Sequence, residues 1–339
     1  MHRSVIAFSM ALFLACSAAA QRTDYPSLPP FHVPDSVEIR HVDIYSEGTR
    51  MSGQFYADKS NAGKKLPTII MAHGWGGYAS GLEREAVAFA QAGYLVLTFD
   101  YRGWGPSDSK LVLTAKREPS DVKNNRFTAE VQEVREAVEP LDEVIDWENA
   151  LSFAVGDPQC DPNRIGLWGS SLSGGLVVSL AERDTRVKAV HSQVPALEGR
   201  WVLATPGDQK LTYDETTKRA EIDTPFPLPG AVTVANLHGA PIRYQFAMWF
   251  PVEFIGTIPN VAMQFVIAGA DELVDNKTNG LRAYELAKGP KNLVTIPGIQ
   301  HYGIYYEMAA RNQARDLAIV WFDRYVKNAG AQAKGTGAK

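Results

Sequence analysis

Residues 164 to 176, RIGLWGSSLSGGL, place the serines Ser170, Ser171 and Ser173 between two glycines. An apolar run typical of a buried strand leads here into a run typical of a helix, which is the setting of a nucleophile elbow. The central residue of such an elbow has a strained backbone, so the residues two before and two after it must be small. Only Ser171 is flanked in this way, by Gly169 and Ser173, although the usual pattern has glycine at the second of these positions. Ser171 is therefore the predicted nucleophile.

A serine hydroxyl needs a base to take its proton, and the base needs a carboxylate that fixes its tautomer and stabilises its cation. Asp271 directly follows the apolar run VAMQFVIAG, and His301 follows the next such run, NLVTIPG. Both runs are typical of buried strands, so both residues are predicted at strand ends. Glu272 and Asp275 are close enough in sequence to be alternative acids.

A loop rich in glycine, HGWGG at residues 73–77, follows another predicted strand. Glycines let backbone amides approach a substrate, and an oxyanion hole needs two such donors. We predict the amides of Trp75 and Leu172 as these donors, since Leu172 begins the helix after Ser171. His73 is expected to shape the loop and not to titrate in catalysis.

The elements that must position these residues alternate along the chain. After about residue 66, short apolar runs alternate with helix-like runs, which predicts a mostly parallel sheet covered by helices on both faces. Two earlier runs, at 37–48 and 51–59, alternate apolar and polar residues and predict an antiparallel pair at the sheet edge. The expected fold is an α/β, doubly wound, mostly parallel sheet of about eight strands. The expected helices are Glu83–Gln91, Leu141–Val155, Gly174–Glu182, Gly280–Lys288 and Arg311–Lys327, with a further helix-like run at 126–138 before Pro140.

Residues 198–257 break this alternation and carry several aromatic side chains. They are predicted to form a cap-like insertion over the edge of the sheet where the catalytic residues lie. In that case Trp201, Tyr244 and Trp249 are expected to bind substrate as an apolar wall. The alternative is an irregular surface excursion whose aromatic residues pack only against one another.

The N-terminus has the order of a secretory signal: a basic start, an apolar run and the small residues Ala18, Ala19 and Ala20. The expected division is a signal peptide at 1–20, an N-terminal extension at 21–35, the main domain at 36–328 and a flexible tail at 329–339. The protein is therefore expected to be exported to a periplasmic or extracellular compartment. Lipid anchoring through Cys16 is the alternative.

Composition narrows the classes of function. The chain has 339 residues, 45% hydrophobic and 21% charged, which is typical of a folded globular protein with a large core. A formal net charge of −4 gives no attraction to nucleic acid or anionic lipid. The sequence has no metal-ligand cluster, so no metal and no cofactor are expected. Beyond the signal only Cys160 remains, and it cannot close an internal disulfide.

From about residue 36 to 328 the chain resembles the α/β-hydrolase superfamily, nearest to its dienelactone hydrolase-like and acetyl esterase-like branches. The resemblance rests on HGWGG, DYRGWGPSD, DPNRIGLWGSSLSGG, GADELVD and HYGIYYE, in this order. It implies Ser171 as nucleophile, His301 as general base and Asp271 as its orienting acid.

These residues together predict a secreted serine hydrolase that cleaves a small-molecule carboxylic ester through an acyl-enzyme. The same triad can serve a thioesterase, a peptidase or lactonase, or a cofactor-free perhydrolase. Two other classes are a binding protein that keeps the hydrolase fold without its chemistry and a surface lipoprotein that acts as a scaffold. The sequence leaves the oligomeric state open.

Overall fold

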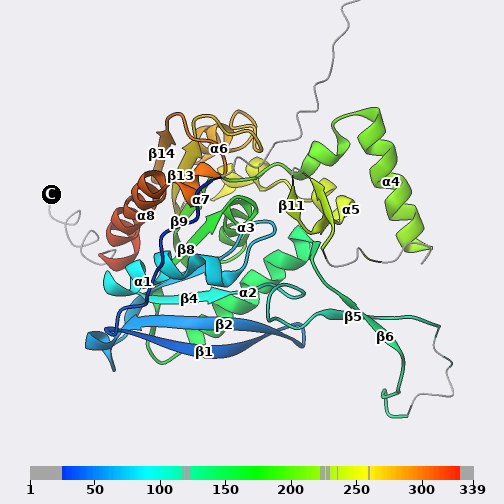
Figure 1. Ribbon diagram of the computed structural model, residues 1–339, viewed down its shortest axis with the longest axis horizontal. Coiled ribbons are helices and arrows are strands. Elements are labelled where there is room, and N and C mark those ends of the chain that lie inside the picture. The colour runs from blue at the N-terminus through cyan, green and yellow to red at the C-terminus, as the bar shows by residue number, and fades with distance from the viewer. Residues whose placement is uncertain are drawn as a thin grey trace, which may run out of the picture.

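A computed structural model describes residues 25–328, except 117, 119–122, 222–225, 227–229, 235 and 259. The expected signal peptide and the expected tail lie outside the described residues. Eight strands form the main sheet in the order β1-β2-β4-β3-β8-β9-β13-β14 (Figure 1). Their bounds are β1 (Val37–Ser46), β2 (Thr49–Asp58), β3 (Leu66–Ala72), β4 (Leu95–Phe99), β8 (Cys160–Ser170), β9 (Val187–Gln193), β13 (Ala262–Ala268) and β14 (Lys291–Ile296).

The direction of the strands confirms the predicted sheet. β1 pairs with β2 and β2 with β4 in antiparallel fashion, and every later pair in the sheet is parallel. The parallel strands β3, β4 and β13 are buried along their whole length, as their continuous apolar runs require. β1 has exposed residues between its buried ones because one face of this edge strand meets solvent.

Helices cover both faces of the sheet. On β3, Ile69 and Met71 pack in one core with residues of α1 and α8, whereas Leu66 and Ile70 pack in the other with residues of α2 and α3. The sheet is therefore doubly wound, as predicted. The helices are α1 (Glu83–Gln91), α2 (Pro140–Gly156), α3 (Leu172–Ala181), α6 (Gly280–Leu286), α7 (Gly303–Tyr306) and α8 (Met308–Phe322), with shorter turns at η1 (Lys59–Asn61), η2 (Ala79–Leu82) and η7 (Asp323–Lys327).

The helix-like run at 126–138 is a correction to the sequence-based expectation, because it forms strands. β5 (Lys110–Leu113) and β6 (Val131–Val134) make an antiparallel hairpin that projects from the body (Figure 1). β7 (Ala137–Val138) then pairs with β12. The β-branched valines of this run fit a pleated surface better than a helix, and Leu113 lies directly opposite Val131 across the hairpin.

The segment 198–257 leaves the sheet after β9 and returns to it at β13, so it is an insertion between two neighbouring strands. It is tied to the N-terminus of α2, where Gln245 Oε1 accepts a hydrogen bond of 3.0 Å from the Leu141 amide. Its elements are η4 (Gly199–Leu203), α4 (Pro206–Ala220), β10 (Val232–Val234), β11 (Leu237–His238), β12 (Ala240–Pro241), α5 (Arg243–Ala247), η5 (Pro251–Glu253) and η6 (Ile255–Thr257).

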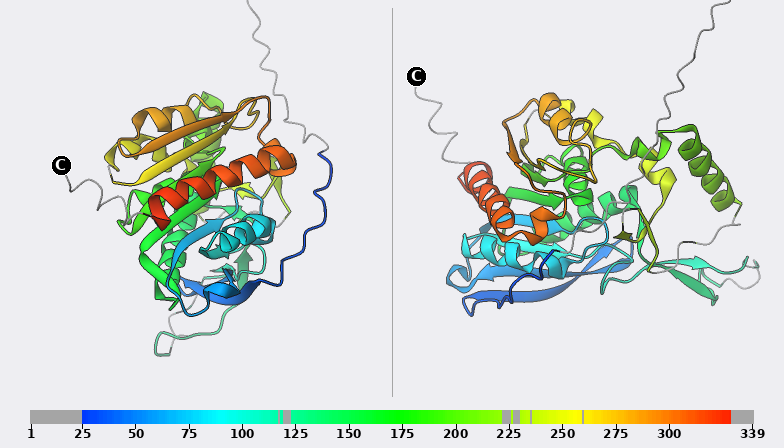
Figure 2. Two further views of the ribbon diagram at one scale, coloured as in Figure 1. Left: turned by 90° about the vertical axis from the view of Figure 1, so that its left-hand side faces the viewer. Right: turned by 45° about the horizontal axis from the view of Figure 1, so that its top comes forward.

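The first described residues, 25–34, run without regular secondary structure along one side of the body (Figure 2). The Tyr25 ring stacks on the Tyr306 ring with a centroid distance of 5.6 Å. The Arg84 guanidinium lies 4.8 Å from the centroid of the Phe31 ring. These contacts place the N-terminal segment beside α1 and α7, close to the carboxyl ends of the parallel strands.

Candidate active site

The turn between β8 and α3 has the backbone geometry of a nucleophile elbow. Ser171 has φ 58° and ψ −122°, a conformation that is costly for a residue with a Cβ. Its amide donates to Gln193 O at 2.8 Å, and its carbonyl accepts from the Ala196 amide at 3.0 Å. A Cβ on Gly169 would lie 2.2 Å from Ser173 O, so glycine is required two residues before the serine.

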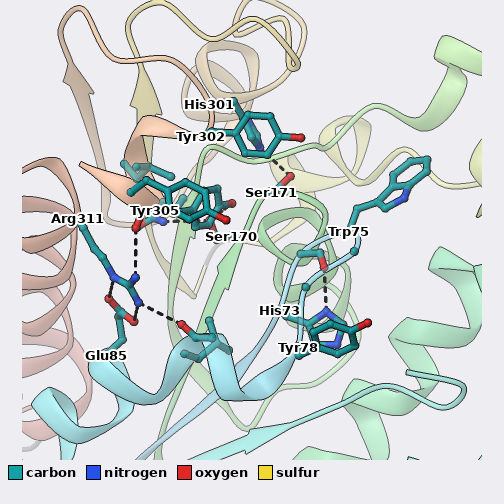
Figure 3. Close-up of a pocket in the computed structure, with 18 of the residues that line it drawn as sticks. His73, Trp75, Tyr78, Glu85, Ser170, Ser171, His301, Tyr302, Tyr305 and Arg311 are labelled. Atoms are coloured by element: carbon teal, nitrogen blue, oxygen red, sulfur yellow. Dashed lines mark hydrogen bonds and ion pairs between the residues drawn. The ribbon is translucent and has the colours of Figure 1, made fainter. Parts of the chain in front are cut away.

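Ser171, His301 and Asp271 form a continuous hydrogen-bonded series, of which Figure 3 shows the contact between Ser171 and His301. His301 Nε2 lies 3.0 Å from Ser171 Oγ, and His301 Nδ1 lies 2.9 Å from Asp271 Oδ2. The second carboxylate oxygen of Asp271 accepts from the Leu273 and Val274 amides at 3.0 and 2.9 Å. With the aspartate on Nδ1, the imidazole presents an unprotonated Nε2 to the serine hydroxyl.

The alternative acids occupy different positions. Glu272 Oε2 accepts a hydrogen bond of 2.7 Å from the backbone amide of His301, so it positions the histidine backbone and not its ring. Asp275 accepts from the Lys277 amide at 3.1 Å and from Thr278 Oγ1 at 3.0 Å on the exposed side of the loop. Among these three carboxylates, hydrogen bonds to the His301 ring come from Asp271.

The glycine loop after β3 lies directly against the elbow. A Cβ on Gly74 would lie 2.7 Å from Ser170 O and 3.7 Å from Leu172 N, so the loop approaches the start of α3 closely. Neither the Trp75 amide nor the Leu172 amide donates to another backbone or side-chain acceptor of the described residues. Trp75 Nε1 donates to Gly239 O at 3.2 Å, which ties the loop to the insertion. The two amides are thus available to a ligand.

His73 lies beneath this loop and is almost fully buried. Its Nδ1 donates to Gly74 O at 2.9 Å, and burial lowers the pKa of His73 to about 4. Its Nε2 lies 3.5 Å from Asp100 Oδ1, and burial raises the pKa of Asp100 to about 6. A neutral imidazole that binds the carbonyl of Gly74 supports the loop and does not serve as a base, in keeping with the expected role.

A pocket of about 350 Å³ opens above Ser171 and His301. Figure 3 shows Trp75 on one side of Ser171, and Tyr305 with Ser170 on the other. The insertion contributes three residues to the pocket, and Leu28 of the N-terminal segment lines it as well. The three residues from the insertion are Asn236, Leu237 and His238. The other lining residues include Tyr78, Leu82, Glu85, Trp168, Gln193, Tyr302, Ile304, Tyr305, Tyr306, Arg311 and Arg315.

Trp201, Tyr244 and Trp249, predicted to bind substrate, do not line this pocket. Trp249 is 3% exposed and donates from Nε1 to Ser179 Oγ of α3 at 2.9 Å. Trp201 packs against Phe246 within the insertion, with ring centroids 5.7 Å apart. Tyr244 is 46% exposed. Trp249 thus packs on α3, Trp201 packs within the insertion and Tyr244 meets solvent, so the predicted apolar wall is not formed by them. The insertion meets the pocket through β11 and the turn before it instead.

Sequence analysis did not identify Tyr305, Gln193 and Ser170 as a set. The Tyr305 hydroxyl lies 2.7 Å from Ser170 Oγ, which also accepts from Gln193 Nε2 at 3.0 Å. The only signal in the sequence is the aromatic run after His301, in which no single tyrosine stands out. Ser170 ends β8, Gln193 ends β9 and Tyr305 lies in α7, so these side chains come together only in the folded protein.

Two further properties concern the part of the chain that the structure describes. No group of His, Cys, Asp and Glu side chains there has an arrangement that could bind a metal ion. None of its helices combines the length and the apolar character that crossing a membrane requires.

Comparisons with known proteins agree with this fold. The family model for acetyl xylan esterase (AXE1) matches residues 33–223. The quorum-quenching protein AidA of Acinetobacter baumannii is 30% identical over 47% of this chain, and the match spans 45% of AidA, less than half its length. The thiohydrolase aneE of Aspergillus aculeatus is 24% identical over 87% of this chain and 96% of its own.

Solved structures show the same fold at low sequence identity. A hypothetical protein from Pseudomonas aeruginosa has a TM-score of 0.68 with 20% identity, covering 89% of this chain and 99% of its own. An acetyl xylan esterase from Paenibacillus sp. R4 has a TM-score of 0.56 with 17% identity, covering 88% of this chain and 91% of its own. The eight-stranded sheet is therefore that of an α/β-hydrolase.

Proposed function

This chain belongs to the acetyl xylan esterase (AXE1) family of α/β hydrolases, and from that premise we propose that it cleaves a carboxylic ester through an acyl-enzyme on Ser171. The observation that carries the proposal is the series Ser171–His301–Asp271, with distances of 3.0 and 2.9 Å, in which Ser171 and His301 line a pocket. The family model supports the reaction class, and the geometry supports the assignment of roles.

In the acylation step, Ser171 Oγ bonds to the ester carbonyl carbon while its proton passes to His301 Nε2. The carbonyl electron pair moves onto the carbonyl oxygen, and the Trp75 and Leu172 amides donate hydrogen bonds to it. Asp271 stabilises the resulting imidazolium through Nδ1. The carbon–alkoxy bond then breaks, and His301 delivers its proton to the leaving alkoxy oxygen.

In the deacylation step, a water molecule takes the place of the alcohol. His301 Nε2 accepts a proton from this water, and the oxygen bonds to the acyl carbon. When the intermediate collapses, the bond to Ser171 Oγ breaks, and the serine recovers its proton from His301. Acid and serine are released, and no cofactor is needed.

A thioester is the second candidate substrate, since sulfur can leave in the same step. The likeness to the thiohydrolase aneE over most of both chains favours it over an amide or lactone. The match to AidA covers less than half of that protein and supports no choice of substrate.

We also infer export, from the signal-like first twenty residues, and place the mature N-terminus at Gln21. Intact-mass analysis of the protein from the expressing cell tests this inference. A chain that begins at Gln21 supports soluble export, whereas a lipid-modified Cys16 or an uncleaved chain overturns it.

The proposed function is tested by active-site labelling together with substrate turnover. A fluorophosphonate should attach to Ser171, as shown by peptide mass mapping, and Ser171→Ala should lower ester turnover by several orders of magnitude while the protein stays folded. Ser173→Ala is the matched control and should remain active. Labelling at Ser170 or Ser173, or an unchanged rate in Ser171→Ala, would falsify the assignment. Parallel assays on ester, thioester, amide and lactone substrates then rank the candidates.

A further inference from the structure

Tyr305 presents a hydroxyl group to the pocket beside Ser171. It lies in α7, four residues after His301, and its ring centroid is 6.1 Å from that of His301. Its hydroxyl is 2.7 Å from Ser170 Oγ, and Gln193 Nε2 is 3.0 Å from the same oxygen. The side chains of Gln193, Ser170 and Tyr305 thus form a chain of hydrogen bonds that ends next to the nucleophile.

The direction of this chain follows from which groups can donate. The amide nitrogen of Gln193 only donates, so Ser170 Oγ accepts there. Ser170 is 1% exposed, and among the described residues Tyr305 is its remaining hydrogen-bond partner. Because a buried hydroxyl normally donates to an acceptor, the Ser170 proton is directed to the Tyr305 oxygen. The proton of Tyr305 is then free to point toward Ser171 and the pocket.

Burial raises the pKa of Tyr305, so its hydroxyl stays protonated and keeps a proton to donate while its oxygen accepts from Ser170. The backbone of α7 is also fixed. The Arg311 guanidinium donates to Tyr305 O at 3.2 Å and forms a two-point ion pair with Glu85 of α1, with both N–O distances 2.5 Å. A donor held from both its side chain and its backbone loses little entropy when it binds a ligand.

The position of Tyr305 selects the oxygen that it can serve. Trp75 lies on the opposite side of Ser171 in Figure 3, and the amides of Trp75 and Leu172 take the carbonyl oxygen in the proposed reaction. The leaving alkoxy oxygen must instead face His301 Nε2, which protonates it. Tyr305 follows His301 on that side and contacts its ring, so the alkoxy oxygen is the substrate atom within its reach.

We propose that the Tyr305 hydroxyl is a catalytic hydrogen-bond donor to the alkoxy oxygen of the bound ester, an assignment that rests on the proposed function. As the carbon–oxygen bond breaks, its electron pair moves onto the alkoxy oxygen. His301 transfers its proton to that oxygen, while Tyr305 stabilises the growing negative charge and keeps its own proton. The donor matters most for esters whose alcohol is a poor leaving group.

The experiment compares two esters with the same acyl group, ethyl butyrate and p-nitrophenyl butyrate, in the wild type and Tyr305→Phe. For the ethyl ester, kcat/KM should fall by about 10- to 100-fold, less than the roughly 100- to 1,000-fold loss of an oxyanion-hole donor, because His301 still protonates the same oxygen. For the nitrophenyl ester it should fall by less than about threefold, because nitrophenolate is already a stable anion. The loss should appear in kcat more than in KM.

Two variants make the comparison specific. Tyr94→Phe removes a hydroxyl that donates to Asp323 at 2.7 Å outside the pocket, so it should leave the ratio of the two esters unchanged. Ser170→Ala keeps Tyr305 but removes the side chain that orients it, and should show a smaller loss with the same selectivity for the ethyl ester. Equal losses for both esters in Tyr305→Phe, or no loss for either, overturn the role of Tyr305. A wild type that cleaves neither ester overturns the proposed function itself.

Discussion

Asp271 Oδ2 lies 2.9 Å from His301 Nδ1, and both side chains are closed to solvent, with exposed fractions of 0% and 2%. Asp271 Oδ1 is already an acceptor for the Leu273 and Val274 amides. Oδ1 also lies 3.1 Å from His301 Nδ1, so the loop after β13 fixes a carboxylate whose two oxygens both face the imidazole, Oδ2 more closely.

This division predicts the effect of Asp271→Asn. The two backbone amides require an oxygen at the δ1 position, so the new amide nitrogen takes the δ2 position, which is the nearer of the two to His301 Nδ1. Nδ1 then has to accept, which moves the ring proton to Nε2 and prevents that atom from taking the Ser171 proton. We expect kcat to fall by about three to four orders of magnitude, measured with p-nitrophenyl acetate.

The matched control is Asp275→Asn, because the Asp275 carboxylate accepts from Lys277 and Thr278 in its own turn, on the exposed side of the loop. Its kcat should stay within about twofold of the wild type, as for a surface change away from the reaction. If the control loses as much activity as Asp271→Asn, the acid has been assigned to the wrong residue.

A second prediction concerns Gly169, the small residue before the elbow. In Gly169→Ala the new Cβ would meet Ser173 O at 2.2 Å, so the first turn of α3 must move. We expect a loss of about 1 to 3 kcal/mol in the free energy of unfolding and a strongly reduced rate of fluorophosphonate labelling. Urea denaturation and labelling kinetics measure the two effects.

Gly156→Ala is the control for this substitution. Gly156 ends α2, and a Cβ there meets no atom within 4 Å. Its stability should be equal to the wild type or higher by about 0.5 to 1 kcal/mol, because alanine has less freedom to lose on folding. Normal labelling of Gly169→Ala would show that the elbow tolerates a larger residue and that the steric argument fails.

The sequence predicts Ser171, Asp271 and His301 as a group because each follows an apolar run typical of a parallel strand, although β14 before His301 is a partly exposed edge strand. The carboxyl ends of such strands share one edge of the sheet, so residues far apart along the chain meet there. The antiparallel edge pair is equally predictable, since β1 and β2 alternate in polarity and are joined by a short turn. For these residues and strands, the local sequence pattern is enough to predict their position in the fold.

Other features depend on contacts that no local pattern specifies. Trp249 could face a substrate or a helix with the same sequence around it, and the choice of α3 depends on Gly175 leaving room for its ring. The run at 126–138 has helix-compatible residues, yet its valines pair with Leu113 and the preceding strand. Tyr305 gains its role only because Ser170 and Gln193 meet it from two other strand ends.

A third prediction uses the buried pair beneath the glycine loop. Burial raises the pKa of Asp100 to about 6 from 3.8, so its protonated form is favoured in the folded state. The stability that this provides is present below about pH 4 and is lost as the pH rises through 6. Burial lowers the pKa of His73 from 6.5 to about 4, so its contribution has the opposite sign: it is present above 6.5 and is lost as the pH falls toward 4.

Asp100→Asn removes the contribution of the raised Asp100 pKa and leaves that of the lowered His73 pKa. The free energy of unfolding of the variant, relative to that of the wild type, should therefore rise by about 3 kcal/mol between pH 4 and pH 7, the equivalent of two pKa units. Urea denaturation of both proteins at several pH values measures the difference. Parallel pH curves would show that Asp100 does not carry a raised pKa in the folded protein. Asp108→Asn, at an exposed carboxylate paired with Arg50, is the control and should follow the wild-type curve.

The last prediction distinguishes a residue of the insertion that lines the pocket from one that packs on α3. Leu237 lines the pocket from β11, so Leu237→Ala removes apolar surface from the pocket wall, and we expect a longer acyl chain to depend on that surface more than acetate does. At about 25 cal/mol per Å², a lost side chain of this size costs roughly 1 to 3 kcal/mol of substrate binding. The ratio of kcat/KM for butyrate over acetate esters should fall by about tenfold, with the acetate value nearly unchanged.

Trp249→Phe is the control, because it keeps most of the packing on α3 but loses the hydrogen bond to Ser179. It should lower the free energy of unfolding by about 1 to 3 kcal/mol and leave the ratio of the two esters unchanged. The reverse result, a changed ratio in Trp249→Phe with none in Leu237→Ala, would place the acyl group against α5 and η5 instead of β11.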